Sequence, residues 1–170
     1  MTLKITTNPS ALERVQASFR QLSTSAASLN AVSDELRESI SELETALEKL
    51  NLGVSAWVKI AGGHDEHGLY YWSRDLGYTQ AGKGWGIALR TVSGDETSPE
   101  DETQEIWPFN DAPRWMRVEG VGKIPELLDA LNKQAEETAK KIKSKNTEAK
   151  ALAEAVKQLT AEQPKDAPRK

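Results

Sequence analysis

The residues with the most evident chemical potential lie in one short segment, which runs His64-Asp65-Glu66-His67. Two histidines three positions apart can chelate a metal ion, but zinc sites normally use three or four ligands. No third partner is evident, and these are the only two histidines, so a histidine-based hydrolase would also have to use this segment. We expect a solvated polar turn, with no bound metal and no cofactor; His64 and His67 are only weak metal candidates.

A glycine-rich segment, Gly82-Lys83-Gly84-Trp85-Gly86, is the one candidate for binding a phosphate. Its lysine is not followed by Ser or Thr at the P-loop spacing, and no dinucleotide fingerprint opens a helix here. A hairpin turn accounts for the glycines. An alternative function nevertheless uses this region: a sensor for a nucleotide or sugar, in which Trp side chains stack on the ligand and its binding residues are Lys83, Trp85 and Arg90.

Other catalytic patterns are missing from the sequence. The absence of cysteine excludes disulfides, thiolate zinc sites and cysteine nucleophiles. No serine lies in a GxSxG motif, and there is no HExxH motif. The five carboxylates of segment 95–102 lack the EF-hand spacing and predict a flexible acidic loop. The sequence therefore predicts that the protein is not an enzyme.

Charge and hydropathy narrow the classes of partner. The net charge is −4, and the basic stretch 140–145 is typical of a solvated helix face, so we expect no nucleic-acid partner. No apolar run approaches 18 residues, and the beginning of the sequence lacks the apolar region of a signal peptide. We therefore expect no membrane association and a cytoplasmic location.

Aromatic residues and glycines mark the organisation of the chain. Nine of the ten aromatic residues lie between Trp57 and Trp115, and all eleven glycines lie between Gly53 and Gly122. The flanks are rich in Ala, Leu, Glu, Lys and Ser, which favour helix. We predict a first helix in 8–52, a β meander in the Trp- and Gly-rich head 53–120, a second helix in 121–160, and a disordered tail in 161–170.

Both predicted helices carry heptad repeats. The first begins at a capping box, Ser10 with Glu13, and the second has Pro125 in its first turn. We call the row of side chains at heptad positions a and d the seam of a helix. In the first helix it is formed by Leu12, Val15, Phe19, Leu22, Ala26, Leu29, Ser33, Leu36, Ile40, Leu43, Leu47 and Leu50. The seam of the second runs from Val121 to Leu159 and matches the first layer by layer if the two helices pair antiparallel.

The predicted fold class is therefore α+β: a long antiparallel coiled-coil hairpin with a small antiparallel β meander inserted at its tip. The order of helical arms around strands resembles, in outline only, that of prefoldin-type chaperone subunits. That resemblance implies assembly through β elements and offers a second alternative function, a holdase chaperone.

The leading functional hypothesis is a non-enzymatic interaction protein, a scaffold or adaptor. Small residues flank the seam of the first helix at 11, 18, 25, 32, 39 and 46, which favours close approach of another helix and a homodimer formed through the helices. The head would present an aromatic patch to a protein partner. The candidate binding residues are Trp57, Lys59, Tyr70, Trp72 and Arg74.

Overall fold

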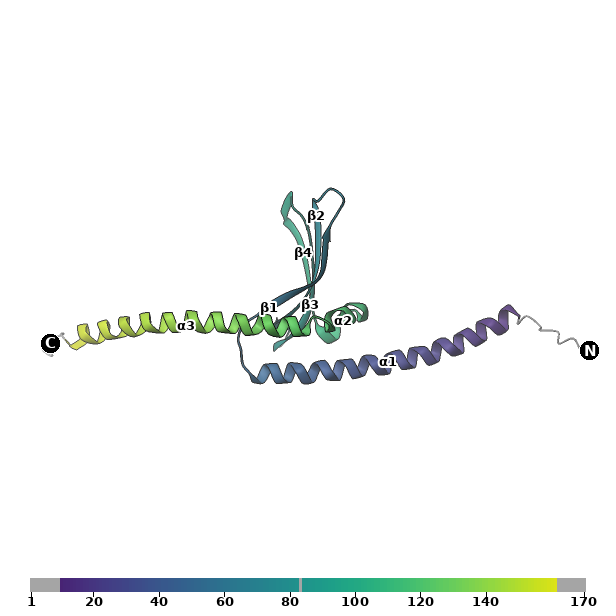
Figure 1. The fold of residues 1–170 in the computed structure, drawn as a ribbon, viewed down its shortest axis with the longest axis horizontal. Helices are drawn as coiled ribbons and strands as arrows, with labels where there is room; N and C mark the ends of the chain where they lie inside the picture. Colours follow the sequence, from purple (N-terminus) through teal and green to yellow (C-terminus); the bar gives the residue numbers. More distant parts are fainter. Residues whose placement is uncertain (1–9, 83, 162–170) are drawn as a thin grey trace, which may run out of the picture. The chain divides into compact units, whose positions relative to one another are not determined.

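The computed structural model describes residues 10–82 and 84–161 and contains three α-helices and four strands among them (Figure 1). The chain divides into two compact units, one that ends at Ala46 and one that begins at Leu47. The elements in chain order are α1 (Ala11–Lys49), β1 (Ala56–His64), β2 (Tyr70–Ala81), β3 (Gly84–Asp95), β4 (Ser98–Pro108), a 3-10 helix (Phe109–Asp111), α2 (Arg114–Val121) and α3 (Ile124–Ala161).

The capping box predicted at the start of the first helix is confirmed, and α1 runs from Ala11 to Lys49. The backbone N–H of Ser10 donates to Glu13 Oε2 at 2.7 Å, and the N–H of Glu13 donates to Ser10 Oγ at 3.3 Å, which is a capping box. The hydrogen bond from the Ser10 backbone N–H, together with the nearby Ser10 hydroxyl, favours the ionised carboxylate and holds the pKa of Glu13 below its usual value. At the other end Asn51 adopts a φ of 47°, a left-handed conformation that asparagine tolerates and that stops a helix.

The four strands form one antiparallel sheet in the order β1-β2-β3-β4, so the predicted meander is confirmed. The register sets Leu76 opposite both Val58 and Leu89, and Tyr78 opposite both Ala56 and Ile87. Because side chains alternate along a strand, these residues share one face of the sheet. The residues between them, such as Trp57 and Asp75, belong to the other face.

One end of the first face is covered by α2 and the start of α3. Leu76 and Leu89 are completely buried there with Phe109, and Leu127 and Leu131 of α3 are also buried. Gly120 permits the close approach of α2, since a Cβ at this position would lie 3.0 Å from Leu89 Cδ2. The other ends of the strands extend past these helices (Figure 1). We call this part, residues 61–73 and 92–105, the distal sheet.

The predicted helical hairpin with the meander at its tip is wrong. Every residue in 11–32 and in 139–161 is exposed, although the hairpin would bury one face of each segment. Leu12 and Leu159, predicted to share a layer, are 66% and 67% exposed. The physical reason lies at the start of α3, which packs against β1 and β2 and buries Leu127 and Leu131. The outline resemblance to prefoldin subunits depended on the hairpin and is lost with it.

Two local predictions in the head are also wrong. The segment 95–102, expected to be a flexible acidic loop, runs mostly within β4. An edge strand needs only its main-chain hydrogen bonds to one neighbour, and its exposed side chains can carry charge. The predicted β meander also extended to residue 120, but β4 ends at Pro108 and 115–118 belongs to α2. The helical spacing of α2 directs Met116 and Gly120 toward the sheet.

Some predictions concern residues that lie wholly or partly outside the described ranges. α3 ends at Ala161, and the rest of the expected disordered tail, 162–170, lies outside the described residues. Lys83 is also outside them. Among 10–82 and 84–161, no helix has an apolar stretch long enough to span a bilayer.

Gly77 provides a test of the uncovered face of the sheet, because a Cβ there would lie 2.3 Å from the Trp57 ring. We expect Gly77→Ala to lower the free energy of unfolding by about 1–3 kcal/mol, since a small-to-large change forces the ring away. Urea denaturation followed by circular dichroism measures this. Gly84→Ala is the matched control in the same sheet, because its Cβ would have no neighbour within 4 Å. Equal stability of the two variants would contradict the packing described.

Candidate functional site

An arginine held between two tryptophans forms the most distinctive surface feature of the head. Trp72 and Arg74 are two positions apart on β2 and therefore share a face. The Arg74 guanidinium carbon lies 4.9 Å from the centre of the Trp72 ring and 5.0 Å from that of Trp115, the second residue of α2. The cation thus contacts both rings at distances typical of cation–π interactions.

Glu119 completes this group, which we call the aromatic–arginine cluster (Trp72, Arg74, Trp115 and Glu119). It lies four residues after Trp115, on the same side of α2. Its Oε2 is 3.1 Å from Arg74 Nη2, and the two side chains are 42% and 24% exposed, so the ion pair itself contributes at most about 1 kcal/mol. The two rings and the carboxylate together fix the orientation of the guanidinium.

The rings of this cluster remain accessible. Trp72 is 37% exposed and Trp115 is 51% exposed, and Val118 in the next turn of α2 is 65% exposed. Trp and Arg are enriched among the residues that dominate the affinity of protein interfaces. The cluster therefore combines an exposed apolar surface with a charge that is already oriented.

Sequence reasoning found half of this cluster. Trp72 and Arg74 were predicted from their alternation on a strand, whereas Trp115 and Glu119 were missed. The signal that would have found them is helical spacing: Trp115 and Glu119 are four apart, and Pro113 immediately precedes the helix.

The opposite face of the sheet carries a second stack. Trp57 lies across Gly77, and the Arg90 guanidinium carbon is 4.2 Å from the centre of the Trp57 ring. Arg90 Nε donates to Asp75 Oδ2 at 2.9 Å, and Asp75, only 6% exposed, also accepts a bond from the Ser73 hydroxyl. Each charge here has a partner within the head.

The structure therefore divides the residues predicted to bind a partner. Tyr70, Trp72 and Arg74 lie on the face that α2 partly covers, whereas Trp57 and Lys59 lie on the opposite face. A single flat partner cannot contact all five at once. Only the first group extends onto α2, through Trp115.

The residues of the alternative ligand site are not brought together. Trp85 stacks on the buried Tyr78, with ring centres 5.6 Å apart and an interplanar angle of 25°. Arg90 lies five residues further along β3, on the opposite face, where it contacts Trp57. Lys83, as noted, is outside the described residues. Trp85 and Arg90 are thus parts of two separate packing arrangements.

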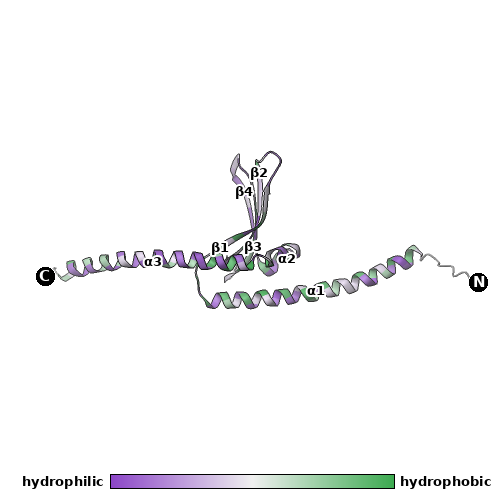
Figure 2. Cartoon of the chain, viewed as in Figure 1, coloured by the Kyte–Doolittle hydropathy of each residue, from purple (hydrophilic) through white to green (hydrophobic). Residues whose placement is uncertain are grey.

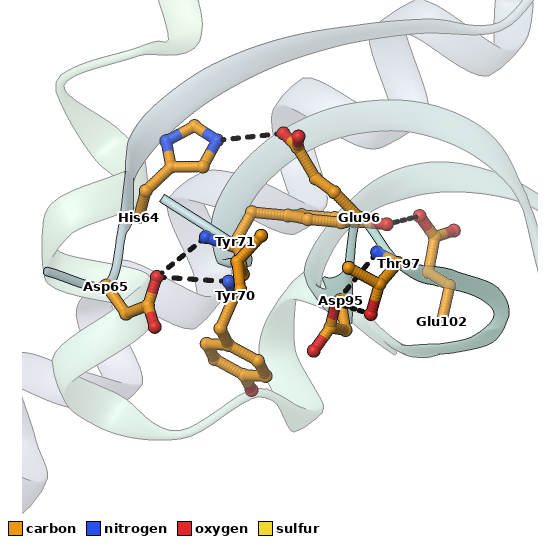
Figure 3. Close-up of polar contacts among 9 residues, drawn as sticks. His64, Asp65, Tyr70, Tyr71, Asp95, Glu96, Thr97 and Glu102 are labelled. Atoms are coloured by element: carbon orange, nitrogen blue, oxygen red, sulfur yellow. Dashed lines mark hydrogen bonds and ion pairs between the residues drawn. The ribbon is translucent and has the colours of Figure 1, made fainter. Parts of the chain in front are cut away.

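Polar contacts at the end of the distal sheet hold its turns (Figure 3). Asp65 Oδ1 accepts from the N–H groups of Leu69 and Tyr70, at 2.9 and 3.1 Å, and confirms the predicted polar turn. In the other turn Asp95 accepts from the hydroxyl and the N–H of Thr97, and these bonds lower the pKa of Asp95. Such bonds replace backbone partners in tight turns.

Two further contacts join the strands across this end of the sheet. His64 Nε2 lies 3.5 Å from Glu96 Oε1, and the Tyr71 hydroxyl donates to Glu102 Oε2 at 2.5 Å. A shallow hollow of about 410 Å3 opens beside His64, Tyr71 and Glu96. Within 10–82 and 84–161, no group of three or more His, Cys, Asp or Glu side chains is placed to hold a metal ion.

The Tyr71–Glu102 contact predicts a pH dependence. The hydrogen bond to Glu102 and its negative charge raise the pKa of Tyr71, because ionisation breaks the bond and sets two anions side by side. This stabilising contribution is complete below the ordinary tyrosine pKa, near 10, and is lost as the pH rises through the raised value.

We expect Glu102→Gln to lower the Tyr71 pKa toward its ordinary value, and Tyr71→Phe to remove the corresponding ionisation. Ultraviolet titration of tyrosinate measures both, and Glu100→Gln, an exposed residue on the same strand, is the control. An unchanged titration in Glu102→Gln would refute the contact.

Comparisons with known proteins assign no role to these residues. No protein-family model matches the chain, and neither the curated proteins nor the solved structures contain a significant match. The features of the protein that point to a function are therefore the aromatic–arginine cluster, with its exposure, contacts and charges, and the exposed faces of the long helices.

Proposed function

We propose that the protein is a non-enzymatic interaction protein, a scaffold or adaptor, that presents the aromatic–arginine cluster to a protein partner and self-associates through its long helices. The observation that carries the proposal is that Trp72 and Trp115 hold Arg74 between them and yet remain 37% and 51% exposed. An aromatic pair of this kind is a ready anchor for a complementary pocket.

The organisation of the cluster suits a protein partner. Ordering a long arginine side chain costs about 0.5–1.5 kcal/mol when an interface forms. Arg74 is already fixed by two rings and Glu119, so most of that cost does not arise on binding. Val118 extends the apolar surface along α2, and Glu119 gives it a polar border, as in the core and rim of an interface.

The self-association part of the proposal rests on the helices. In 11–32 the exposed side chains include Leu12, Val15, Phe19, Leu22 and Leu29, each between 47% and 71% exposed and at heptad spacing. Such a row of large apolar residues is typical of a surface that another helix covers. The proposal also includes a cytoplasmic location, with which the absence of cysteine is consistent.

Quantitative capture of partners from a lysate of the source organism tests the role of the cluster. We expect the double variant Trp72→Ala, Trp115→Ala to lose at least about 90% of a partner that the unaltered protein retains. The reason is that the two aromatic side chains together contribute more than about 1.4 kcal/mol to the binding free energy, which corresponds to a tenfold change in affinity. Ile106→Ala, which removes a 45% exposed apolar side chain from the other face, is the control.

Circular dichroism must show that the double variant keeps the fold. A set of captured proteins that is the same for the unaltered protein and the double variant would overturn the role of the cluster. It would leave self-association untouched, since the helix faces are separate from these residues.

Light scattering tests self-association directly. We expect a dimer at micromolar protein concentration, because each chain exposes five large apolar seam residues in 11–32. A mass of 18.7 kDa throughout the concentration series, the mass of one chain, would remove this half of the proposal.

A further inference from the structure

The first half of α1 is a helix whose stability is not explained by its own sequence. All 22 residues from Ala11 to Val32 are exposed. Only three of them are charged, namely Glu13, Arg14 and Arg20, and apolar and polar residues alternate along the helix (Figure 2). Helices in proteins owe most of their stability to packing of an apolar face, and isolated ones of this length are marginal in water.

The exposed end of α3 differs in this respect. Its residues 139–161 include eight charged side chains, six Lys and two Glu. Lys145 Nζ lies 2.6 Å from Glu148 Oε2, one turn away, so ion pairs along the helix support it in water. If this segment paired with the same segment of a second copy, two helices that each carry a net charge of +4 would repel each other. Segment 11–32 of α1, with a net charge of only +1, is therefore the one suited to pairing with its own copy.

We infer that segment 11–32 pairs with the same segment of a second copy of this chain, antiparallel, in a two-stranded coil centred between Arg20 and Gln21. The inference rests on the self-association proposed above and names its surface and register. In an antiparallel coiled coil, a residue at heptad position a of one helix packs against a residue at position d of the other. In this register the numbers of the two residues that face each other add up to 41. The layers are Leu12 with Leu29, Val15 with Ala26, and Phe19 with Leu22, and the symmetry of the dimer repeats each of them once.

The charge and size of the residues beside the seam are compatible with this register. The positions beside the seam are uncharged and mostly small, namely Ala11, Gln16, Ser18, Ser23, Ser25, Asn30 and Val32. Small flanking residues let two helices approach closely. Glu13, Arg14 and Arg20 fall on the outer side of the coil, so no like charges meet across it.

Neighbouring registers fit less well. A shift of one heptad in one direction pairs Leu12 with Leu36 and Val15 with Ser33, but Leu36 and Ser33 are already half-buried in their own chain. A shift in the other direction leaves Leu29 without an apolar partner among the described residues. The register centred between Arg20 and Gln21 covers the exposed segment from one end to the other.

Spin labels measure the direction and register in the full-length protein. The chain has no cysteine, so Gln21→Cys and Ala31→Cys each introduce one label site on an exposed outer position. In the inferred dimer the two labels at 21 are offset along the axis by only about 1.5 Å, and those at 31 by about 32 Å. Pulsed electron resonance should therefore give a much longer distance for 31. Similar distances at both sites indicate a parallel pair and overturn the inference.

Substitutions test which face is used. We expect Leu22→Glu to raise the dimer dissociation constant at least about 100-fold, because it buries a carboxylate near the centre of the coil. Ala17→Glu places the same group on the outer side and should leave the constant within about threefold. Sedimentation equilibrium measures both, with helix content checked by circular dichroism.

The outcomes separate the inference from the proposal on which it rests. A monomeric unaltered protein overturns both. A dimer that survives Leu22→Glu, or one that Leu152→Glu in α3 dissociates instead, overturns the α1 pairing and leaves self-association standing. Loss of partner capture in the cluster variant bears on neither result.

Discussion

The head depends on the burial of one end of one sheet face under α2 and the first turns of α3. Leu76, Leu89 and Phe109 are completely buried there, and Gly120 allows α2 to reach them. A small antiparallel sheet needs such a cover, because a single layer of strands cannot by itself remove enough apolar surface from water. The other features of the head follow from how far this cover extends.

Because the cover stops part of the way along the strands, the distal sheet has two uncovered faces and must be stabilised by other means. A Cβ at Gly94 would lie 2.7 Å from the Tyr71 hydroxyl, and one at Gly63 would lie 3.4 Å from Trp72 Nε1. Aromatic rings thus cover glycine backbone where no hydrophobic core is present. The aromatic–arginine cluster lies at the boundary, where Trp115 on the covering helix meets Trp72 on the exposed part of β2.

The comparison of sequence and structure shows which signals carry information on partners. The heptad repeat identified the apolar face of each long helix, but a repeat says nothing about what covers that face. At the start of α3, which was predicted to pair with the first helix, Leu127 and Leu131 are buried and the helix contacts β1 and β2. Capping residues such as Ser10 and Glu13 act within one turn and were predictable. Which elements pack against one another depends on contacts across the whole chain, and this packing was not predictable from local patterns.

The same distinction applies to the candidate site. Trp72 and Arg74 are neighbours on one strand, so local alternation was enough to group them. Trp115 and Glu119 join them only because α2 returns to the sheet. Trp57 was grouped with Trp72 on composition alone, and the register sets the two on opposite faces.

The outer strand of the meander explains how an open sheet avoids growing by addition of further copies. Along β4 the exposed Glu100, Asp101, Glu102 and Glu105 give one edge a dense negative charge. Two such edges repel each other before their free main-chain groups can pair, and the bulge between Lys59 and Ala61 interrupts the other edge. We expect this repulsion to oppose fibril formation, and concentrated salt, which screens charges beyond a few ångströms, to weaken it.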